Sequence, residues 1–430
     1  MTEPSPPSLE AISSCVAGYD PHDLPVAQAR EFIRQMVPHV AGVEMLALRS
    51  ALGRVLARDV VSAIDVPPQD NAAMDGYALR GQDLAEQGET VLRVVGSGLA
   101  GQAFAGRAAP GECVRIMTGA VIPEGLDTVV PQELVRREGD RIAIAAGVAR
   151  VGDNRRRAGE DLARSETALA AGRLLRPADL GLLASLGMPE VPVLRRLRVA
   201  FFSTGNELRS VGEALGPGCV YDSNRYTLWG MLHRLGVEVL DLGVVADDPA
   251  ALESAFLDAA ANADVVITSG GVSVGEADHT KAVMSRLGEV LFWRIAIRPG
   301  RPMAIGRIRS GARQAVLFGL PGNPVAVMVT FYALVRDALL AMSGARPEAL
   351  PLARAFCTAP IRKRPGRTEY QRGVVAQADD GRLQVSTTGA QGSGILRSMS
   401  QANALIVLGH DQGDVAAGEV VSVLLFEGLT

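Results

Sequence analysis

The chain is organised around Thr268–Gly275, TSGGVSVG, which follows the apolar run DVVIT at Asp264–Thr268. That run has the length and composition of a strand buried on both faces, as in a parallel sheet. Three glycines within the next seven residues let the backbone turn tightly and approach a bulky anionic ligand. Asp278 is suited to cap a helix that begins near His279, so that amide groups and the positive end of the helix dipole face the same space. Together these features predict a phosphate cradle at the carboxyl end of a parallel strand.

An ordinary tight turn between a strand and a helix is the alternative for this stretch. No Gly-Lys-Ser/Thr follows the loop, so it is not a P-loop, and its glycines lack the Gly-x-Gly-x-x-Gly spacing of a dinucleotide site. The local residues leave both interpretations open.

Strands and helices alternate around this stretch, from about residue 198 to residue 344. Strands are expected at Val199–Ser203, Val237–Leu240 and Val316–Gly319, with a helix from Pro249 to Ala261 and a long apolar helix ending at Met342. This alternation predicts a three-layer α/β domain with a parallel sheet. Ligands bind at the carboxyl ends of the strands in such sheets, so polar residues that follow the strands are candidates for the site.

The flanking segments differ in texture. Residues 25–56 have helical spacing, with a second helical piece at 47–53, and residues 150–187 are again helix-forming. Short β-like runs between Gly and Pro residues fill 64–144, and short strands with Gly turns after 345 suggest a small barrel. The predicted domains are a discontinuous N-terminal helical linker domain at 22–62 and 149–194, an inserted mostly β domain at 63–148, the α/β domain at 195–344 and a C-terminal small β-barrel at 345–430.

Composition narrows the classes of function. With 48% hydrophobic residues the chain can bury real cores, and a net charge of -4 with 4% aromatics argues against nucleic acid as a partner. The four cysteines are scattered without CxxC spacing, which indicates reduced thiols. No apolar run suggests a membrane span, and the N-terminus MTEPSPPSLE resembles a disordered tail without a signal core. We therefore expect a cytoplasmic protein with no membrane contact.

Several stretches stand in a characteristic order along the chain: DNAAMDGYA, RIMTGAVIPEG, STGNEL, YDSN, TSGGVSVGEADHTK, IAIRPGRPMAIG, FGLPGNPVA, GRTEYQRG and TTGAQGSG. Together they resemble the MoeA-type molybdopterin molybdenumtransferases, the family that includes the E domains of gephyrin and its plant counterpart. The similarity runs from about residue 25 to near the C-terminus.

The resemblance implies a four-domain subunit of an elongated homodimer, with a molybdopterin-binding α/β domain and a last domain that is a small β-barrel. The implied reaction is a step of molybdenum cofactor biosynthesis. Adenylated molybdopterin and molybdate give molybdenum cofactor and AMP, with Mg2+ as the metal cofactor. The active site is implied to lie between the α/β domain of one subunit and the β domain of the other. Contact with molybdopterin adenylyltransferase and with acceptor molybdoenzymes is also implied.

The family motifs imply two sets of site residues. The catalytic set is Asp75, Thr118, Glu207, Asp248 and Asp278, of which Glu207, Asp248 and Asp278 are also the implied Mg2+ ligands, as hard carboxylates suit this ion. Guanidinium groups suit tetrahedral oxyanions because they donate paired hydrogen bonds. The set implied to bind the substrates is Ser269, Gly270, Gly271, Ser273, Gly275, Arg294, Arg298, Arg301, Pro321, Asn323, Arg367 and Ser393.

Some of these residues also have simpler structural explanations, and some positions differ from the family pattern. Asp278 is also explained as a helix cap alone, Glu207 as a turn residue, and Arg301 as a surface charge. Family members often carry Lys at 294, 298 and 301 and Ser at 326, where this chain has Arg and Ala326. The sequence leaves open whether the oxyanion substrate is molybdate or tungstate.

Other functions are weighed beside metal insertion. The preceding adenylyltransferase step uses a similar α/β domain but would not need the flanking β domains. A scaffold of the gephyrin kind would be expected to carry an additional adenylyltransferase domain and a long linker, which this sequence does not show. A catalytically idle paralogue is disfavoured because the set of carboxylates is intact.

Overall fold

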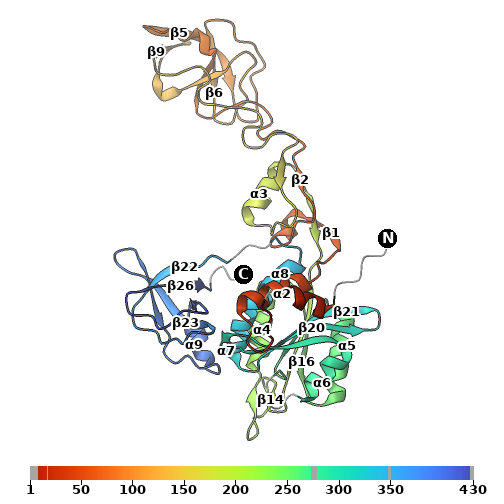
Figure 1. Cartoon of the computed structure of the whole chain (residues 1–430). Helices are drawn as coiled ribbons and strands as arrows, with labels where there is room; N and C mark the ends of the chain where they lie inside the picture. Colours follow the sequence, from red (N-terminus) through yellow and green to blue (C-terminus); the bar gives the residue numbers. More distant parts are fainter. Residues whose placement is uncertain (1–7, 17, 273–277, 347–349, 427–430) are drawn as a thin grey trace. The chain divides into compact units, whose positions relative to one another are not determined.

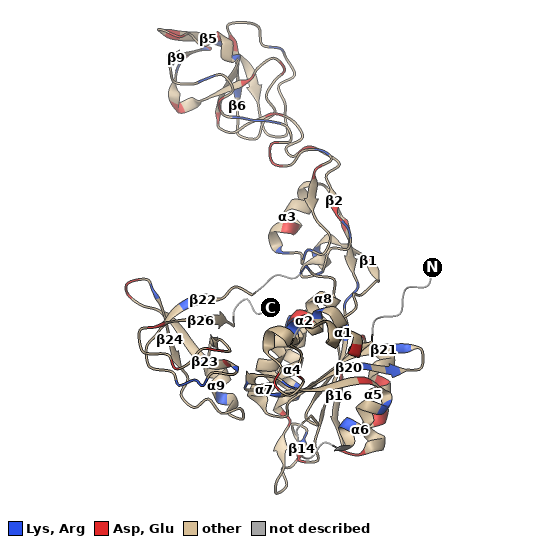
Figure 2. Ribbon diagram, viewed as in Figure 1, with Lys and Arg blue, Asp and Glu red and all other residues tan. Residues whose placement is uncertain are grey.

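The computed structural model describes residues 8–16, 18–272, 278–346 and 350–426, and of Asp278 only the main chain. Its contacts divide the chain into two compact units. The large unit comprises Met1–Glu44, Gly53–Val55 and Val193–Thr430, and the small unit comprises Met45–Leu52 and Leu56–Pro192. Figure 2 shows acidic and basic residues interspersed along the ribbon of both units.

A six-stranded sheet forms the centre of the large unit, in the order β16-β13-β17-β21-β20-β18 (Figure 1). Four of these strands, β16, β13, β17 and β21, run parallel, so their carboxyl ends share one edge of the sheet. The bounds are β13 (Arg198–Thr204), β16 (Glu238–Val245), β17 (Val265–Ser269), β18 (Gly288–Arg294), β20 (Pro302–Ser310) and β21 (Arg313–Leu320).

The sheet is mixed, whereas the alternation of strands and helices predicted parallel strands only as far as β21. β20 runs antiparallel to β21, and β18 runs antiparallel to β20. The two-residue connection Gly311–Ala312 between β20 and β21 explains this, because a parallel pair needs a long crossover. Gly311 has a φ of 58°, which suits such a hairpin turn.

Helices cover both faces of the sheet. Adjacent residues of β13 alternate between the two cores, with Phe201 packed in the cluster of α4 and Phe202 in the cluster of α5 and α6. The bounds are α2 (Val26–Met36), α4 (Ser223–Arg234), α5 (Pro249–Asn262), α6 (Asp278–Leu287), α7 (Pro324–Thr330) and α8 (Arg336–Met342). α2, α4, α7 and α8 contribute to the first cluster.

Contrary to the expectation from sequence, one continuous helical stretch among the described residues is long and apolar enough to cross a membrane. It is Pro324–Met342, in which a π-helical turn at Phe331–Val335 joins α7 to α8. An 18-residue window of this stretch has a mean hydropathy of 1.8, and 72% of that window is buried inside the structure. That burial is typical of a core helix, which is the part it plays in packing against the sheet.

The C-terminal part of the large unit is a closed five-stranded barrel, as predicted. The strand order β23-β24-β22-β26-β25 closes through a further pairing of β25 with β23, and the short β19 adds to β23 from outside the ring. The bounds are β19 (Ile297–Arg298), β22 (Ala353–Cys357), β23 (Thr368–Gln377), β24 (Leu383–Thr387), β25 (Ala404–Leu408) and β26 (Val420–Leu425), with α9 (Leu396–Gln401) beside them.

The N-terminal segment differs in two places from the prediction. Leu9 and Glu10, expected in a disordered tail, begin helix α1 (Leu9–Cys15), which Ser8 caps through its hydroxyl. Residues 1–7 lie outside the described residues. The second helical piece predicted at 47–53 is a short 3-10 turn, Leu48–Ala51, preceded by β1 (Val43–Ala47). β1 pairs with β12 (Glu190–Leu194).

The small unit contains its own six-stranded sheet, in the order β7-β4-β6-β5-β9-β8. Two-stranded pairs of β2 with β11 and of β3 with β10 connect to it, and α3 is its α-helix within the described residues. The bounds are β2 (Val60–Val61), β3 (Asn71–Ala72), β4 (Gly76–Leu79), β5 (Glu89–Gly98), β6 (Glu112–Ile116), β7 (Thr128–Pro131), β8 (Val135–Glu138), β9 (Arg141–Ala145), β10 (Arg155–Arg156), β11 (Thr167–Leu169) and α3 (Pro177–Ser185).

The helix-forming character predicted for 150–187 applies only to α3. Positive φ angles at Asn154 (55°) and Ser165 (70°) are incompatible with helix there. The side-chain amide of Asn154 instead donates to the carbonyl of Val129 at 2.9 Å, which fastens this segment to the sheet.

Candidate functional site

A pocket of about 920 Å³ opens at the carboxyl edge of the parallel strands of the large unit. Thr204 at the end of β13, Ser269 at the end of β17 and Pro321 after β21 line it. This volume suits a ligand of drug size or larger. The pocket therefore lies where the alternation of strands and helices predicted a ligand site.

The Gly270-Gly271 turn after β17 has the tight conformation that was predicted for these glycines. Their φ angles are 95° and 69°, in the region that favours glycine. A Cβ on Gly270 would lie 2.6 Å from the carbonyl oxygen of Thr204, and one on Gly271 would lie 2.7 Å from the side chain of Thr280. Only glycine fits these two positions without displacing its neighbours. The predicted site residues Ser273 and Gly275, and the side chain of Asp278, lie outside the described residues.

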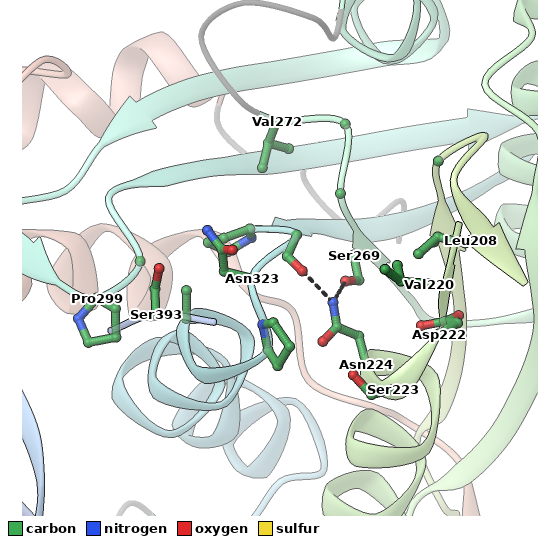
Figure 3. Close-up of a pocket in the computed structure, with 18 of the residues that line it drawn as sticks. Leu208, Val220, Asp222, Ser223, Asn224, Ser269, Val272, Pro299, Asn323 and Ser393 are labelled. Carbon is green, nitrogen blue, oxygen red and sulfur yellow. Dashed lines mark hydrogen bonds between the residues drawn. The ribbon is translucent and has the colours of Figure 1, made fainter. Parts of the chain in front are cut away.

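Asn224 fastens three elements together at the pocket wall. From the first turn of α4, its Nδ2 donates to Ser269 Oγ at 2.8 Å and to the carbonyl of Gly322 at 2.7 Å (Figure 3). Asp222 caps the same helix through Oδ1, which accepts from the amide of Arg225 at 3.1 Å. These contacts fix the relation of α4 to β17 and to the turn that precedes α7.

Several buried oxygens in this wall have no hydrogen-bond partner within the described residues. Among the residues that line the pocket they are Thr204 Oγ1, Asp222 Oδ2, Asn224 Oδ1 and Asp247 Oδ1. Buried polar atoms are nearly always paired in native proteins, so unpaired ones at a cavity indicate a missing partner. A ligand with N–H or O–H donors, or a hydrated cation, would satisfy them.

The predicted carboxylates take different places. Glu207 lines the pocket. Asp248 does not, because its Oδ2 caps α5 by accepting from the amides of Ala250 and Ala251 at 3.1 and 3.0 Å. Its neighbour Asp247 lines the pocket instead, a residue that the sequence interpretation missed although it follows the same strand.

Hard oxygen ligands for Mg2+ are nevertheless present at this wall. Within the described residues no three His, Cys, Asp or Glu side chains come close enough to hold a metal together. Mg2+ is commonly bound through one or two carboxylates with water and substrate phosphates. Glu207 and the unpaired oxygen of Asp247 fit that chemistry.

The three arginines of the segment RIAIRPGR do not share one location. Arg298 lines the pocket, whereas Arg294 and Arg301 do not. Arg301 lies 3.7 Å from a carboxylate oxygen of Asp23. Arg298 Nη1 lies 3.6 Å from Glu369 Oε1, which also accepts from Arg367 Nε at 3.0 Å. Arg367 does not line the pocket, but it is connected to Arg298 through Glu369.

Barrel residues complete the pocket at this end. The loop after β24 contributes Ser393, whose carbonyl accepts from the amide of Val325 in α7 at 3.0 Å. Figure 3 shows Ser393, Pro299 and Asn323 at one end of the pocket, and Leu208 of β14 (Leu208–Arg209), Val220 of β15 (Val220–Tyr221) and Asp222 at the other. Ala326 also lines the pocket.

The small unit brings its two predicted site residues into direct contact. Asp75 Oδ1 accepts from the amide of Thr118 at 2.8 Å and from its hydroxyl at 2.7 Å. The amide, then the hydroxyl, hold the pKa of Asp75 below its usual range. Asp75 is therefore an ionised carboxylate at neutral pH.

Comparison with known proteins places these observations in a family. The MoeA N-terminal region (domain I and II) matches residues 24–187, a probable molybdopterin binding domain matches 200–341, and the MoeA C-terminal region (domain IV) matches 354–426. The chain is 42% identical over 407 residues to a molybdopterin molybdenumtransferase of Haemophilus influenzae, covering 94% of this chain and 99% of that protein. A relative of the same name from Nostoc sp. is 37% identical and covers 89% of this chain and 88% of its own length.

A solved structure agrees with the sequence comparisons. The molybdopterin biosynthesis moeA protein from Pyrococcus horikoshii OT3 has a TM-score of 0.80 and 30% identity, and the match covers 94% of this chain and 100% of that chain. The family regions together span both units of the structure. The chain therefore belongs to the MoeA family.

Proposed function

We propose that this chain is a molybdopterin molybdenumtransferase, which inserts molybdate into adenylated molybdopterin and releases AMP. The observation that carries the proposal is the composition of one pocket. Unpaired acceptor oxygens and a carboxylate line it together with Arg298 and Ser393, which can donate hydrogen bonds. The relatives that bear this name support the same reaction.

Different residues of the pocket have different roles in this reaction. Gly270 and Gly271 line the pocket without side chains, so the bulky adenylate can lie against the backbone there. Arg298 and Ser393 hold the molybdate dianion, because a guanidinium donates paired hydrogen bonds to tetrahedral oxyanions. The dithiolene sulfurs of the pterin are the soft ligands for molybdenum, so the proposal needs no protein thiolate.

Mg2+ belongs to the proposal as a resident cofactor. Glu207 and Asp247 are the described residues that would hold it, with Asp278 as a further carboxylate predicted from sequence. When bound, Mg2+ neutralises phosphate charge and stabilises the departing AMP.

The proposal also includes the assembly and location that the family resemblance implies. The chain acts in the cytoplasm as a homodimer, with Asp75 and Thr118 of one subunit serving the pocket of the other. Mixing an Asp75→Ala chain with an Arg298→Ala chain tests this assembly. Recovered activity in the mixture supports a shared site, and no recovery despite formation of mixed dimers contradicts it.

The direct test of the reaction is AMP release. Purified protein is incubated with adenylated molybdopterin, Mg2+ and molybdate, and AMP is followed by chromatography beside a tube without molybdate. Molybdate-dependent release supports the proposal. Release that ignores molybdate, or rapid adenylation of molybdopterin by ATP in a third tube, contradicts it.

A further inference from the structure

Glu369 is a buried carboxylate shared by two arginines next to the pocket. Its side chain is only 1% exposed. Its Oε1 accepts from Arg367 Nε at 3.0 Å and lies 3.6 Å from Arg298 Nη1. Its Oε2 accepts from Gln371 Nε2 at 3.1 Å. Both oxygens are therefore engaged, although neither faces solvent.

The backbone register creates this arrangement. β19 pairs in parallel with β23, and Arg298 and Glu369 are direct partners in that ladder. The amide of Thr368 adds a hydrogen bond to the carbonyl of Ala296 at 2.9 Å. The segment that carries Arg298 into the pocket is thus fixed to the same barrel strand that carries Glu369.

The local charge balance favours an anionic ligand. Two guanidinium groups share one carboxylate, so one positive charge is in excess. Arg372 on the same strand is also buried. Burial, with a contribution from the charge of Arg298, lowers its pKa to about 10, so it adds a further cation at neutral pH. Arg372 has no carboxylate partner within the described residues, and buried charges are strongly destabilising unless they are paired, so this excess favours an anion nearby.

The two arginines also retain donors for such an anion. Arg367 uses Nε toward Glu369, and its two Nη groups have no hydrogen-bond partner within the described part of the chain. Arg298 is half-exposed and lines the pocket. A guanidinium anchored on one side by a carboxylate has less rotational freedom to lose when it binds an oxyanion on the other side.

We infer that Glu369 is a positioning residue for the oxyanion substrate, which holds the guanidinium group of Arg298 at the pocket and that of Arg367 beside it. This inference rests on the proposed function, because the oxyanion it concerns is molybdate. Glu369 acts through the two arginines and not by contact with the substrate. A change at Glu369 should therefore alter handling of molybdate more than handling of the adenylate.

The test compares Glu369→Ala and Glu369→Gln with the full-length wild type. The glutamine retains an acceptor for Arg367 but loses the charge. We expect the KM for molybdate to rise about tenfold in the alanine variant and about threefold in the glutamine variant. The kcat and the KM for adenylated molybdopterin should stay within about twofold, which a general loss of structure would not allow.

Equilibrium dialysis with molybdate alone gives a readout that does not depend on turnover, and the dissociation constant should rise in the same order. Asp380→Ala is the matched control, because Asp380 also pairs with an arginine, Arg382, but on the exposed barrel surface. It should leave molybdate binding unchanged. Should the alanine variant not fold by circular dichroism, the glutamine variant alone decides.

Three outcomes overturn the inference: unchanged molybdate affinity in folded Glu369 variants, tighter binding in them, or equal rises in both KM values. Failure of the proposed function looks different, since the wild type itself would then neither bind molybdate nor release AMP, and the role of Glu369 would fall with it.

Discussion

Thr118 donates two hydrogen bonds to a single carboxylate oxygen of Asp75, one from its backbone amide and one from its hydroxyl. Both donors favour the ionised carboxylate. Thr118→Val keeps the amide and removes the hydroxyl, so we expect the pKa of Asp75 to rise toward its ordinary value. A carbon-13 NMR titration of the Asp75 carboxyl group measures this directly.

A matched control for Thr118→Val is Thr167→Val, because Thr167 is an exposed threonine of β11 in the same unit. It should leave the titration of Asp75 unchanged. If the midpoint is the same in wild type and Thr118→Val, the hydroxyl does not contribute in solution.

Adjacent aspartates at 247 and 248 should behave differently when each is replaced by asparagine. Asp247→Asn removes the unpaired pocket carboxylate, so we expect AMP release to fall at least about tenfold with little change in stability. Asp248→Asn keeps a side-chain acceptor for the cap of α5 and removes only its charge at the helix N-terminus, so its main effect should be a loss of about 0.5 kcal/mol in unfolding free energy.

Urea unfolding followed by tryptophan fluorescence suits this comparison. Both tryptophans, Trp229 and Trp293, belong to the large unit, so the signal reports that unit alone. The reverse pattern, with activity lost in Asp248→Asn and kept in Asp247→Asn, would contradict the placement of these carboxylates.

These two aspartates also show how far the sequence could go. The apolar strands β13, β17 and β21 and the glycine turn after β17 predicted the correct edge of the correct sheet, because burial and turn chemistry are local properties. Which aspartate faces the pocket depends on where α5 begins. A shift of that start by one residue would make the other aspartate the capping residue and exchange their places. Local sequence does not determine that choice.

The sequence could not show which of the three arginines lines the pocket, for a different reason. Arg294, Arg298 and Arg301 look equivalent in sequence. Of these three, Arg298 lines the pocket, and its strand segment pairs with the segment that carries Glu369. That pairing joins residues far apart in the chain, so local sequence could not predict it. The antiparallel β18–β20–β21 arrangement was missed because no strand was predicted at Met303–Ser310.

Asn224 offers a test of pocket stability. Asn224→Ala removes one buried and one partly buried hydrogen bond and leaves the carbonyl of Gly322 without this donor. We expect the unfolding free energy of the large unit to fall by about 2 kcal/mol, measured by urea unfolding with tryptophan fluorescence. Asn262→Ala, which removes an exposed helix-end contact to Asp258, is the control and should cost much less. Equal losses would contradict a special role for Asn224.

Asp264 should make the stability of the large unit sensitive to acid. Burial alone would raise its pKa, but two hydrogen bonds from Arg195 at 2.8 and 2.7 Å and one from the amide of Arg198 lower it overall. Because the pKa of Asp264 is lower in the folded state, its ionised carboxylate stabilises the folded protein at pH values above the unfolded-state pKa of 3.8. This stabilisation is lost as the pH falls through the folded-state pKa. Asp264→Asn should therefore lose roughly 2 kcal/mol at pH 7, and the difference from wild type should shrink below about pH 4.

The measurement is urea unfolding at pH values from 7 down to about 3, again by tryptophan fluorescence. Asp258→Asn is the control, because Asp258 is an exposed residue of α5 whose carboxylate has no partner among the described residues. A difference between Asp264→Asn and wild type that persists at low pH would contradict the linkage.

Arg372 holds the barrel loop that carries Ser393. Its Nη2 donates to the carbonyls of Gly392 and Ala390 at 2.9 and 3.3 Å, and its Nε donates to Ser398 Oγ at 2.9 Å. A planar guanidinium can serve these acceptors together from a fully buried position. The loop conformation therefore depends on the shape of this side chain as well as its charge.

Replacing Arg372 with lysine separates shape from charge. A lysine ammonium keeps the charge but cannot present the same fork of donors, so we expect faster amide hydrogen exchange across residues 388–394 in Arg372→Lys. Molybdate-dependent AMP release should fall in parallel, because Ser393 would no longer be held at the pocket. Arg382→Lys is the control, since Arg382 pairs with exposed Asp380 on the same barrel, and it should leave exchange in the loop unchanged. Unaltered exchange in Arg372→Lys would mean that the docking of Ser393 against Val325 suffices to order the loop without the guanidinium.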